Sequence, residues 1–237
     1  MKQIKFSICT ASLFMLMSCV DLNLNPLSEG SSENWYSSQA EIEMSLNDFY
    51  RTDFFPIDDM KWGDDVTARN ETSAVNNGTL TSEDGTIAKR WENYYKGIAR
   101  ALRIINNMDR ARAMGVSERD IAQYEGEAYF YLGYAYGMLA FHWGDAILDK
   151  VGMSLDEAYT ASRSPKADVL AYSYECLDKA AERLPNSYPG IQRATKGAAY
   201  AFKARIAIYN EDYAAAATAA KNCMDLNVYK LHSNYQD

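Results

Sequence analysis

A stripe of small residues runs along one long predicted helix, residues 117–143, and onto the residue that follows it, and this stripe restricts how the chain can fold. Its members recur at i, i+7, i+11, i+14 and i+18, and they are Gly126, Gly133, Gly137, Ala140 and Gly144. Each glycine costs a helix about 1 kcal/mol relative to alanine, so a stripe of them indicates compensation by close packing. Large side chains such as Tyr131 and Leu139 lie on the opposite face. The pattern predicts stacked helical hairpins, in which a second helix lies in the groove left by the small residues.

The rest of the chain also follows the helical period. Ser38 and Glu41 match a capping box, and Ser164 with Pro165 predicts an N-cap followed by proline at the first helical position. No segment has convincing β-branched alternation or a hairpin signal. The chain is therefore predicted to be all-α, with helices at about 38–52, 87–109, 117–143, 164–185, 191–210 and 212–226.

A weak internal repeat relates two of these helices. Aligning Gly144-Asp145 with Glu211-Asp212 gives a spacing of 67 residues (211 minus 144), close to twice the tetratricopeptide period of about 34 residues. Gly197, Ala201 and Ala204 repeat the small-residue pattern in the later helix. We expect tetratricopeptide-like helical hairpins, and the alternative is an irregular bundle of alanine-rich helices.

One long irregular loop, residues 54–87, separates the first two predicted helices. A connection of this length inside a compact domain is usually functional or disordered. It contains Trp62 among many carboxylate and amide side chains, the inventory that a sugar needs for its C–H face and its hydroxyls. The candidate ligand-binding residues are Trp62, Arg69, Asn76 and Asn77. The alternative is that Trp62 folds back as a hydrophobic plug while the polar residues only solvate the loop.

The N-terminus has the features of a secretory leader. Lys2 and Lys5 precede an apolar stretch that ends at Met17, too short for a membrane span. The order Leu16-Met17-Ser18-Cys19 resembles the lipobox of bacterial lipoproteins. We therefore expect a lipoprotein signal peptide over 1–18, a lipidated tether over 19–36 and a helical domain over 37–237. The alternative is a simple signal peptide with a coincidental cysteine.

Cys19 would then be the mature N-terminus and the only link to the membrane. The Cys19→Ala variant is expected to fold normally but to lose its anchor, and its recovery in the outer-membrane fraction would contradict lipidation. Two cysteines remain in the helical part, Cys176 and Cys223. Cys223 falls on an apolar helical stripe and is read as a small buried side chain, although a bridge to Cys176 is left open.

Charge and motif content exclude several classes of function. The formal net charge is −8, with 24 basic and 32 acidic residues, and no basic run is present, so nucleic acids and anionic membrane surfaces are unsuitable partners. The sequence has no serine elbow, HExxH, Cys/His metal spacing, P-loop or dinucleotide-binding glycine pattern. We predict a protein that is not an enzyme and that has no metal or cofactor.

An ordered set of motifs resembles the RagB/SusD family of nutrient-uptake lipoproteins. After the lipobox come Trp35-Tyr36, a capped helix that ends in Asn47-Asp48-Phe49-Tyr50, and the run from Trp91 to Ile98. The run from Glu127 to Tyr131 and the corner from Phe141 to Asp145 look like the family's long helix and its end. The next helices match at Arg193 to Ala199, at Ala204-Arg205 and at Asp212-Tyr213-Ala214.

The resemblance implies a surface-exposed lipoprotein of a Bacteroidota-type outer membrane. Such proteins bind an oligosaccharide or another nutrient and deliver it to a partner, a SusC-like TonB-dependent transporter, on which they sit as a lid. Family members are usually longer, so residues 37–237 would correspond to the N-terminal half. The alternatives are a lipid-anchored tetratricopeptide adaptor for another protein and a non-functional fragment.

Overall fold

The computed structural model describes residues 35–36, 38–56, 74–231 and 234. The helices within these ranges belong to one compact unit that begins at Tyr36. Their bounds are α2 Gln39–Asn47, the 3-10 helix η2 Asp48–Tyr50, α3 Gly85–Asn106, α4 Met108–Ala113, α5 Glu118–Trp143, α6 Leu155–Thr160, α7 Lys166–Arg183, α8 Lys196–Tyr209 and α9 Tyr213–Asp225. Within the described ranges the extended structure is a single isolated bridge, between Ala146 and Ser164. The predicted all-α class is confirmed.

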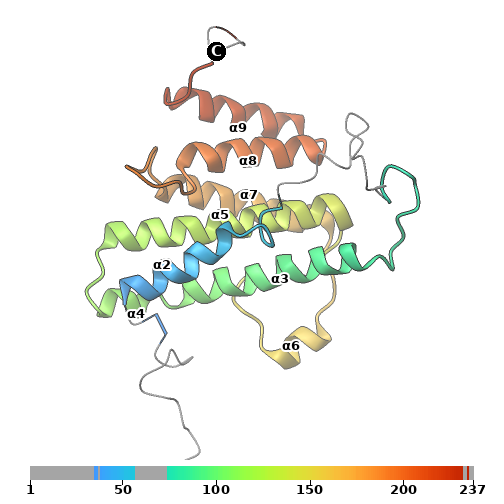
Figure 1. Ribbon diagram of the computed structural model, residues 1–237, viewed down its shortest axis with the longest axis horizontal. Helices are drawn as coiled ribbons and strands as arrows, with labels where there is room; N and C mark the ends of the chain where they lie inside the picture. The colour runs from blue at the N-terminus through green and yellow to red at the C-terminus, as the bar shows by residue number, and fades with distance from the viewer. Residues whose placement is uncertain (1–34, 37, 57–73, 232–233, 235–237) are drawn as a thin grey trace, which may run out of the picture. The chain divides into compact units, whose positions relative to one another are not determined.

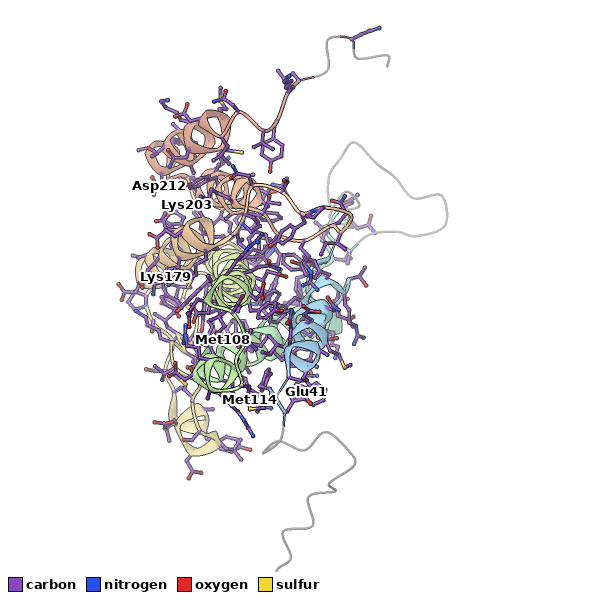
Figure 2. The ribbon with its side chains drawn as sticks, turned by 90° about the vertical axis from the view of Figure 1, so that its left-hand side faces the viewer. Glu41, Met108, Met114, Lys179, Lys203 and Asp212 are labelled. Atoms are coloured by element: carbon purple, nitrogen blue, oxygen red, sulfur yellow. The ribbon has the colours of Figure 1, made fainter. Side chains whose placement is uncertain are left out.

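The helices form two successive hairpins. Helix α5 packs against α7, α8 packs against α9, and α7 packs against α8, so the four lie side by side with α3 along the other flank of α5 (Figure 1). Lys203 of α8 reaches back to Asp178 of α7, with Nζ 2.6 Å from Oδ1. Figure 2 shows Lys179, Lys203 and Asp212 following one another along the same side of α7, α8 and the start of α9. This is the predicted tetratricopeptide-like arrangement.

The small-residue stripe of α5 lies at the helix contacts. A Cβ added at Gly133 would be 2.5 Å from Leu177 Cγ, and one at Gly137 would be 2.5 Å from Ile206 Cδ1. Helices α7 and α8 therefore approach α5 more closely than any side chain would allow. Gly144 has a different role, because it ends the helix with φ +74 and faces open space.

The core is built largely from aromatic side chains on the other face of α5. Tyr131 is fully buried and its ring stacks on Phe49 of η2 at a centroid distance of 4.7 Å. Tyr94 of α3 is 1% exposed and meets Tyr134 edge to face. The capping box that was predicted at Ser38 and Glu41 is present and starts α2, which buries Ile42 and Leu46.

Two predicted helix starts are wrong. Pro165, not Ser164, is the N-cap of α7, because the backbone of Ser164 is already paired with Ala146 in the isolated bridge. Helix α8 begins at Lys196 rather than near residue 191, because Thr195 is its N-cap and Arg193 and Ala194 are held by tertiary hydrogen bonds.

Two short helices were not predicted. The segment predicted as a helix to about residue 109 breaks at Asn107, and α4 follows. Helix α6 has only six residues and none of them is buried, so it is too short for the window over which an apolar period marks a helix. Both cysteines of the helical unit are free, and Cys223 Sγ lies 3.5 Å from the carbonyl oxygen of Gly197. Among the helices that the structure describes, none is long and apolar enough to cross a membrane.

Candidate functional site

Two of the four predicted ligand-binding residues lie among the residues that the structure describes. Trp62 and Arg69, like the predicted lipidation site Cys19, lie outside the described residues. Asn76 and Asn77 are exposed in a turn over 74–78, in which Gly78 has φ +66 and Thr79 N donates to the carbonyl of Ala74. The structure therefore tests where two of the four candidates lie.

A pocket opens where the two ends of the long loop meet. Its volume is about 680 Å³, within the range of small-molecule sites. The described residues that line it come from the segment after η2 and from the first turns of α3: Thr52, Asp53, Pro56, Gly85, Thr86, Lys89, Arg90, Asn93 and Tyr94. We call it the loop-base pocket. Asn76 and Asn77 are not among its lining residues.

The wall formed by residues 51–56 is fixed by aromatic packing behind it. The carbonyl of Arg51 accepts hydrogen bonds from the amides of Phe54 and Phe55, both at 3.0 Å, which makes a tight turn. Phe54 is buried edge-on against Tyr131, and Phe55 stacks on Tyr134 at 4.4 Å. With both phenylalanines held in the core, Thr52 and Asp53 remain exposed on the pocket side.

Ion pairs hold the charged part of this wall. Arg51 Nη2 is 3.1 Å from Asp53 Oδ2, and Arg51 Nη1 is 3.1 Å from Asp48 Oδ1. Asp48 also pairs with Arg100 of α3. Asp53 is therefore held by Arg51 while it keeps an oxygen that can accept further hydrogen bonds.

The opposite wall is the N-terminal part of α3. Asp84 is the N-cap, and the hydrogen bond that its carboxylate accepts from the Thr86 amide, 2.8 Å long, lowers the pKa of Asp84 below its ordinary value. The side chains of Thr86, Lys89, Arg90 and Asn93 follow at i, i+3, i+4 and i+7, so they share one face of the helix. This polar stripe is visible in the sequence beside the apolar stripe of the same helix, but none of its residues was among the predicted site residues.

A buried cluster around Glu127 holds the chain just before the pocket. Glu127 is 2% exposed, and its Oε2 accepts hydrogen bonds of 2.8 Å from Tyr50 Oη and from Arg193 Nη1. Arg193 also donates to Asn47, and the Ala194 amide donates to Tyr50 Oη at 2.9 Å. Burial and the neighbouring Glu127 raise the pKa of Tyr50, so its hydroxyl remains a donor. Segments far apart in the sequence are thus tied together at the end of η2.

Other hollows differ from the loop-base pocket in chemistry. A hollow of about 280 Å³ is lined mainly by rings, Tyr50, Phe55, Phe130 and Phe202, and its one charged group is Arg193, which is already paired. A groove of about 500 Å³ between α8 and α9 is mostly aliphatic. Within the described residues, no group of three or more His, Cys, Asp or Glu side chains could hold a metal ion.

The loop-base pocket has more donor and acceptor side chains than the other two hollows. A carboxylate, an amide, a hydroxyl, an ammonium and a guanidinium group line it, from Asp53, Asn93, Thr86, Lys89 and Arg90, and among these Asp53 pairs with Arg51 and Lys89 with Glu92. Such a set can bind a ligand with many hydroxyl groups through several hydrogen bonds at once. Tyr94 is almost fully buried and presents little aromatic face to the pocket.

A protein-family model and a curated relative match the sequence of this chain. The sequence model of the SusD-like_3 family, described as "Starch-binding associating with outer membrane", matches residues 30–208. The chain is 26% identical to SusD-like protein P38 of Formosa agariphila over 235 residues, which is 94% of this chain and 45% of that protein.

Solved structures show the same fold at lower identity. A SusD-like carbohydrate binding protein from Bacteroides fragilis superposes with a TM-score of 0.72 at 22% identity, over 86% of this chain and 43% of that one. A structure described as containing a xylogluco-oligosaccharide superposes with a TM-score of 0.65 at 18% identity, over 83% and 42% of the two chains. The chain spans less than half the length of the curated relatives that it matches. The family match covers most of the sequence, and the chain belongs to the SusD-like family.

Proposed function

We propose that this protein binds an oligosaccharide at the cell surface and that the loop-base pocket contributes to the binding site. The observation that carries the proposal is the convergence of Asp53, Lys89, Arg90 and Asn93 at the ends of the long loop in a chain of this family. The family description names starch binding, and the related structure with a xylogluco-oligosaccharide adds a second glycan of the same chemical class.

The loop candidates belong to the same proposal. Trp62 follows Pro56 by six residues, so even an extended chain places it within about 20 Å of the pocket wall. Its indole would supply the apolar face that the described lining lacks, and Arg69, Asn76 and Asn77 would supply further hydrogen-bonding groups. We propose Trp62 as the stacking platform for a sugar ring.

The cellular setting is proposed on the leader and on the family. Cys19 would carry the lipid that holds the protein at the outer membrane, and the residues between it and the compact unit that begins at Tyr36 would serve as a tether. The bound glycan would then pass to a SusC-like TonB-dependent transporter. Binding without catalysis is supported by the sequence, which contains none of the hydrolase motifs with a recognisable nucleophile or metal.

Isothermal titration calorimetry with malto-oligosaccharides and xylogluco-oligosaccharides tests the proposal. The Asn93→Ala variant is expected to bind about 5-fold more weakly, because one hydrogen bond contributes about 1 kcal/mol. The Trp62→Ala variant is expected to lose at least 5-fold in glycan affinity, because the apolar C–H face of a sugar ring would no longer have an indole to stack on. Its helicity should stay unchanged. Asn222→Ala on the exposed side of α9 is the matched control and should bind like the unmodified protein.

Two results would count against the proposal in different ways. If the unmodified protein bound neither glycan series, oligosaccharide binding of these classes would be wrong. If it bound one of them but Asn93→Ala and Trp62→Ala kept full affinity, the loop-base pocket would not be the site, and Trp62 would be better explained as a hydrophobic plug.

A further inference from the structure

A row of alternating charges runs from helix α3 to the loop-base pocket. Arg100 of α3 pairs with Oδ2 of Asp48, the first residue of η2. The other oxygen of Asp48 lies 3.1 Å from Arg51 Nη1, and Arg51 Nη2 lies 3.1 Å from Oδ2 of Asp53. We call these four side chains the Arg100 network. It connects a helix residue that does not line the pocket to the carboxylate among the pocket's described lining residues.

The network is anchored in the core at its α3 end. Asp48 is the least exposed of the four charged side chains, at 27%, and the residue after it, Phe49, is buried and stacks on Tyr131. The Arg100 guanidinium also lies over the ring of Phe54, 4.9 Å from its centroid, in a cation–π contact. Arg100 therefore contacts the segment that leads into the pocket at two points.

Arg100 belongs to the helix that forms the opposite wall of the pocket. Asn93, which lines that wall, precedes Arg100 by seven residues (100 minus 93), so the two lie on the same side of α3. The contacts that Arg100 makes with Asp48 and Phe54 cross from α3 to the wall that contains Asp53. The separation of the two walls is therefore set by Arg100 as well as by the packing of the core behind them.

The effect of such a network is local. A single exposed ion pair contributes little to the free energy of unfolding, and Arg51 and Asp53 are 60% and 56% exposed in their side chains. A carboxylate that is already oriented, however, loses less conformational freedom when a ligand binds to it, and preorganisation of this kind raises affinity without a new contact to the ligand. The Arg100 network is therefore expected to change ligand affinity more than stability.

We propose that Arg100 is a positioning residue for glycan binding and that it acts through Asp48 and Arg51 on the carboxylate of Asp53. Hydroxyl groups of the glycan would donate hydrogen bonds to this carboxylate, whereas Arg100 would not touch the glycan. The inference rests on the proposed function, because it takes the loop-base pocket as the glycan site. It deepens that function by naming a residue outside the described lining on which binding depends.

The first test needs no glycan and measures hydrogen–deuterium exchange in the complete chain. In the Arg100→Gln variant, the amides of Phe54 and Phe55 should exchange about 3-fold faster, because the turn that they close on the Arg51 carbonyl would lose its contacts with α3. Arg103→Gln is the matched control, since it makes the same change at an exposed residue three positions further along α3, and it should leave this exchange unchanged. Both variants should keep the melting temperature of the unmodified protein.

The second test is a double-mutant cycle on the affinity for the malto-oligosaccharide or xylogluco-oligosaccharide that the protein binds, measured by isothermal titration calorimetry. Asp53→Asn is expected to weaken binding about 5-fold and Arg100→Gln about 3-fold. Because Arg100 acts through Asp53, the double variant should bind no more weakly than Asp53→Asn alone. In an Asn93→Ala background, by contrast, Arg100→Gln should keep its full effect. Arg100→Lys retains the charge opposite Asp48 and should recover most of the affinity.

The outcomes separate this inference from the proposed function. If the unmodified protein bound neither glycan series, the proposed function would be wrong, and Arg100 would have no role in binding these glycans. If the protein bound a glycan but Arg100→Gln kept full affinity, or its loss added to that of Asp53→Asn, only the positioning role would be overturned. Unchanged exchange at Phe54 and Phe55 in Arg100→Gln would overturn that role whether or not a glycan binds, because Arg100 would then not hold the wall.

Discussion

Glu127 shows what a single residue contributes to this fold. Its carboxylate joins Tyr50 at the end of η2, Arg193 before α8 and Gln123 of its own helix, with Oε1 3.4 Å from Gln123 Nε2. The segments that contain Asn47, Tyr50, Glu127 and Arg193 are also those on which the family resemblance rests. In the sequence they are separate motifs. In the structure Tyr50 and Arg193 both donate hydrogen bonds to the Glu127 carboxylate, and Arg193 also donates to Asn47.

We expect Glu127→Ala to destabilise the protein by about 3–5 kcal/mol, because it leaves the guanidinium of Arg193, whose side chain is 12% exposed, without its counter-charge. Urea unfolding followed by circular dichroism measures the free energy of unfolding. Glu182→Ala is the control, because the Glu182 side chain is 73% exposed, and its effect should stay within about 0.5 kcal/mol. Equal stabilities of the two variants would show that the buried pair contributes little.

Residue-level prediction from the sequence succeeded where a local rule decides the outcome. Ser38 caps its helix as expected because its partner, Glu41, is three residues away. Ser164 does not cap α7 because its backbone pairs with Ala146, 18 residues earlier (164 minus 146). No local sequence pattern predicts a bridge between residues so far apart. No described residue that lines the loop-base pocket was predicted as a site residue, because Lys89, Arg90 and Asn93 share a pocket with Asp53 only in the folded chain.

At the scale of the elements, the glycines of α5 determine how closely the hairpins stack. Gly133 faces Leu177 of α7, and Ser173 Oγ donates to the Gly133 carbonyl at 2.6 Å, so the two helices touch at backbone distance. The spacing of small residues predicted this contact because two helices can approach closely only where their side chains are small, and side-chain size follows from residue identity. Helix α6 was not predicted, although Ser154 and Glu157 carry the same capping-box pattern as Ser38 and Glu41, because its six residues are all exposed and too few for a helical period to stand out.

Gly133→Ala is expected to destabilise the protein by about 1–2 kcal/mol, although alanine is the better helix former. The added methyl group would lie 2.5 Å from Leu177 Cγ and 2.9 Å from the backbone oxygen of Ser173, so the strain exceeds the propensity gain of about 1 kcal/mol. Thermal unfolding compares it with Gly85→Ala, where the methyl group meets open space and stability should stay equal or rise. A Gly133→Ala protein at least as stable as the original would mean that α7 can move away at little cost.

At the scale of the whole molecule, the predicted repeat is only partly present. The 67-residue offset matches the end of α5, Trp143, with the end of α8, Tyr209 (209 minus 143 is 66), but α7 and α9 start only 47 residues apart (213 minus 166), so the two hairpins stack without being equal repeats. Helix α8 starts later than its helical pattern predicts because Arg193 and Ala194 make tertiary hydrogen bonds to Glu127 and Tyr50.

The central claim is that the chain binds an oligosaccharide where the two ends of its long loop meet, and hydrogen–deuterium exchange with and without the bound glycan tests it most directly. Exchange should slow in residues 51–56 and in the first turn of α3, 85–89, because the sugar would cover the amides and side chains of both walls. Exchange in α9, residues 213–225, should not change. Protection confined to α9 or to other segments distant from the loop ends, with none at 51–56 and 85–89, would contradict the claim.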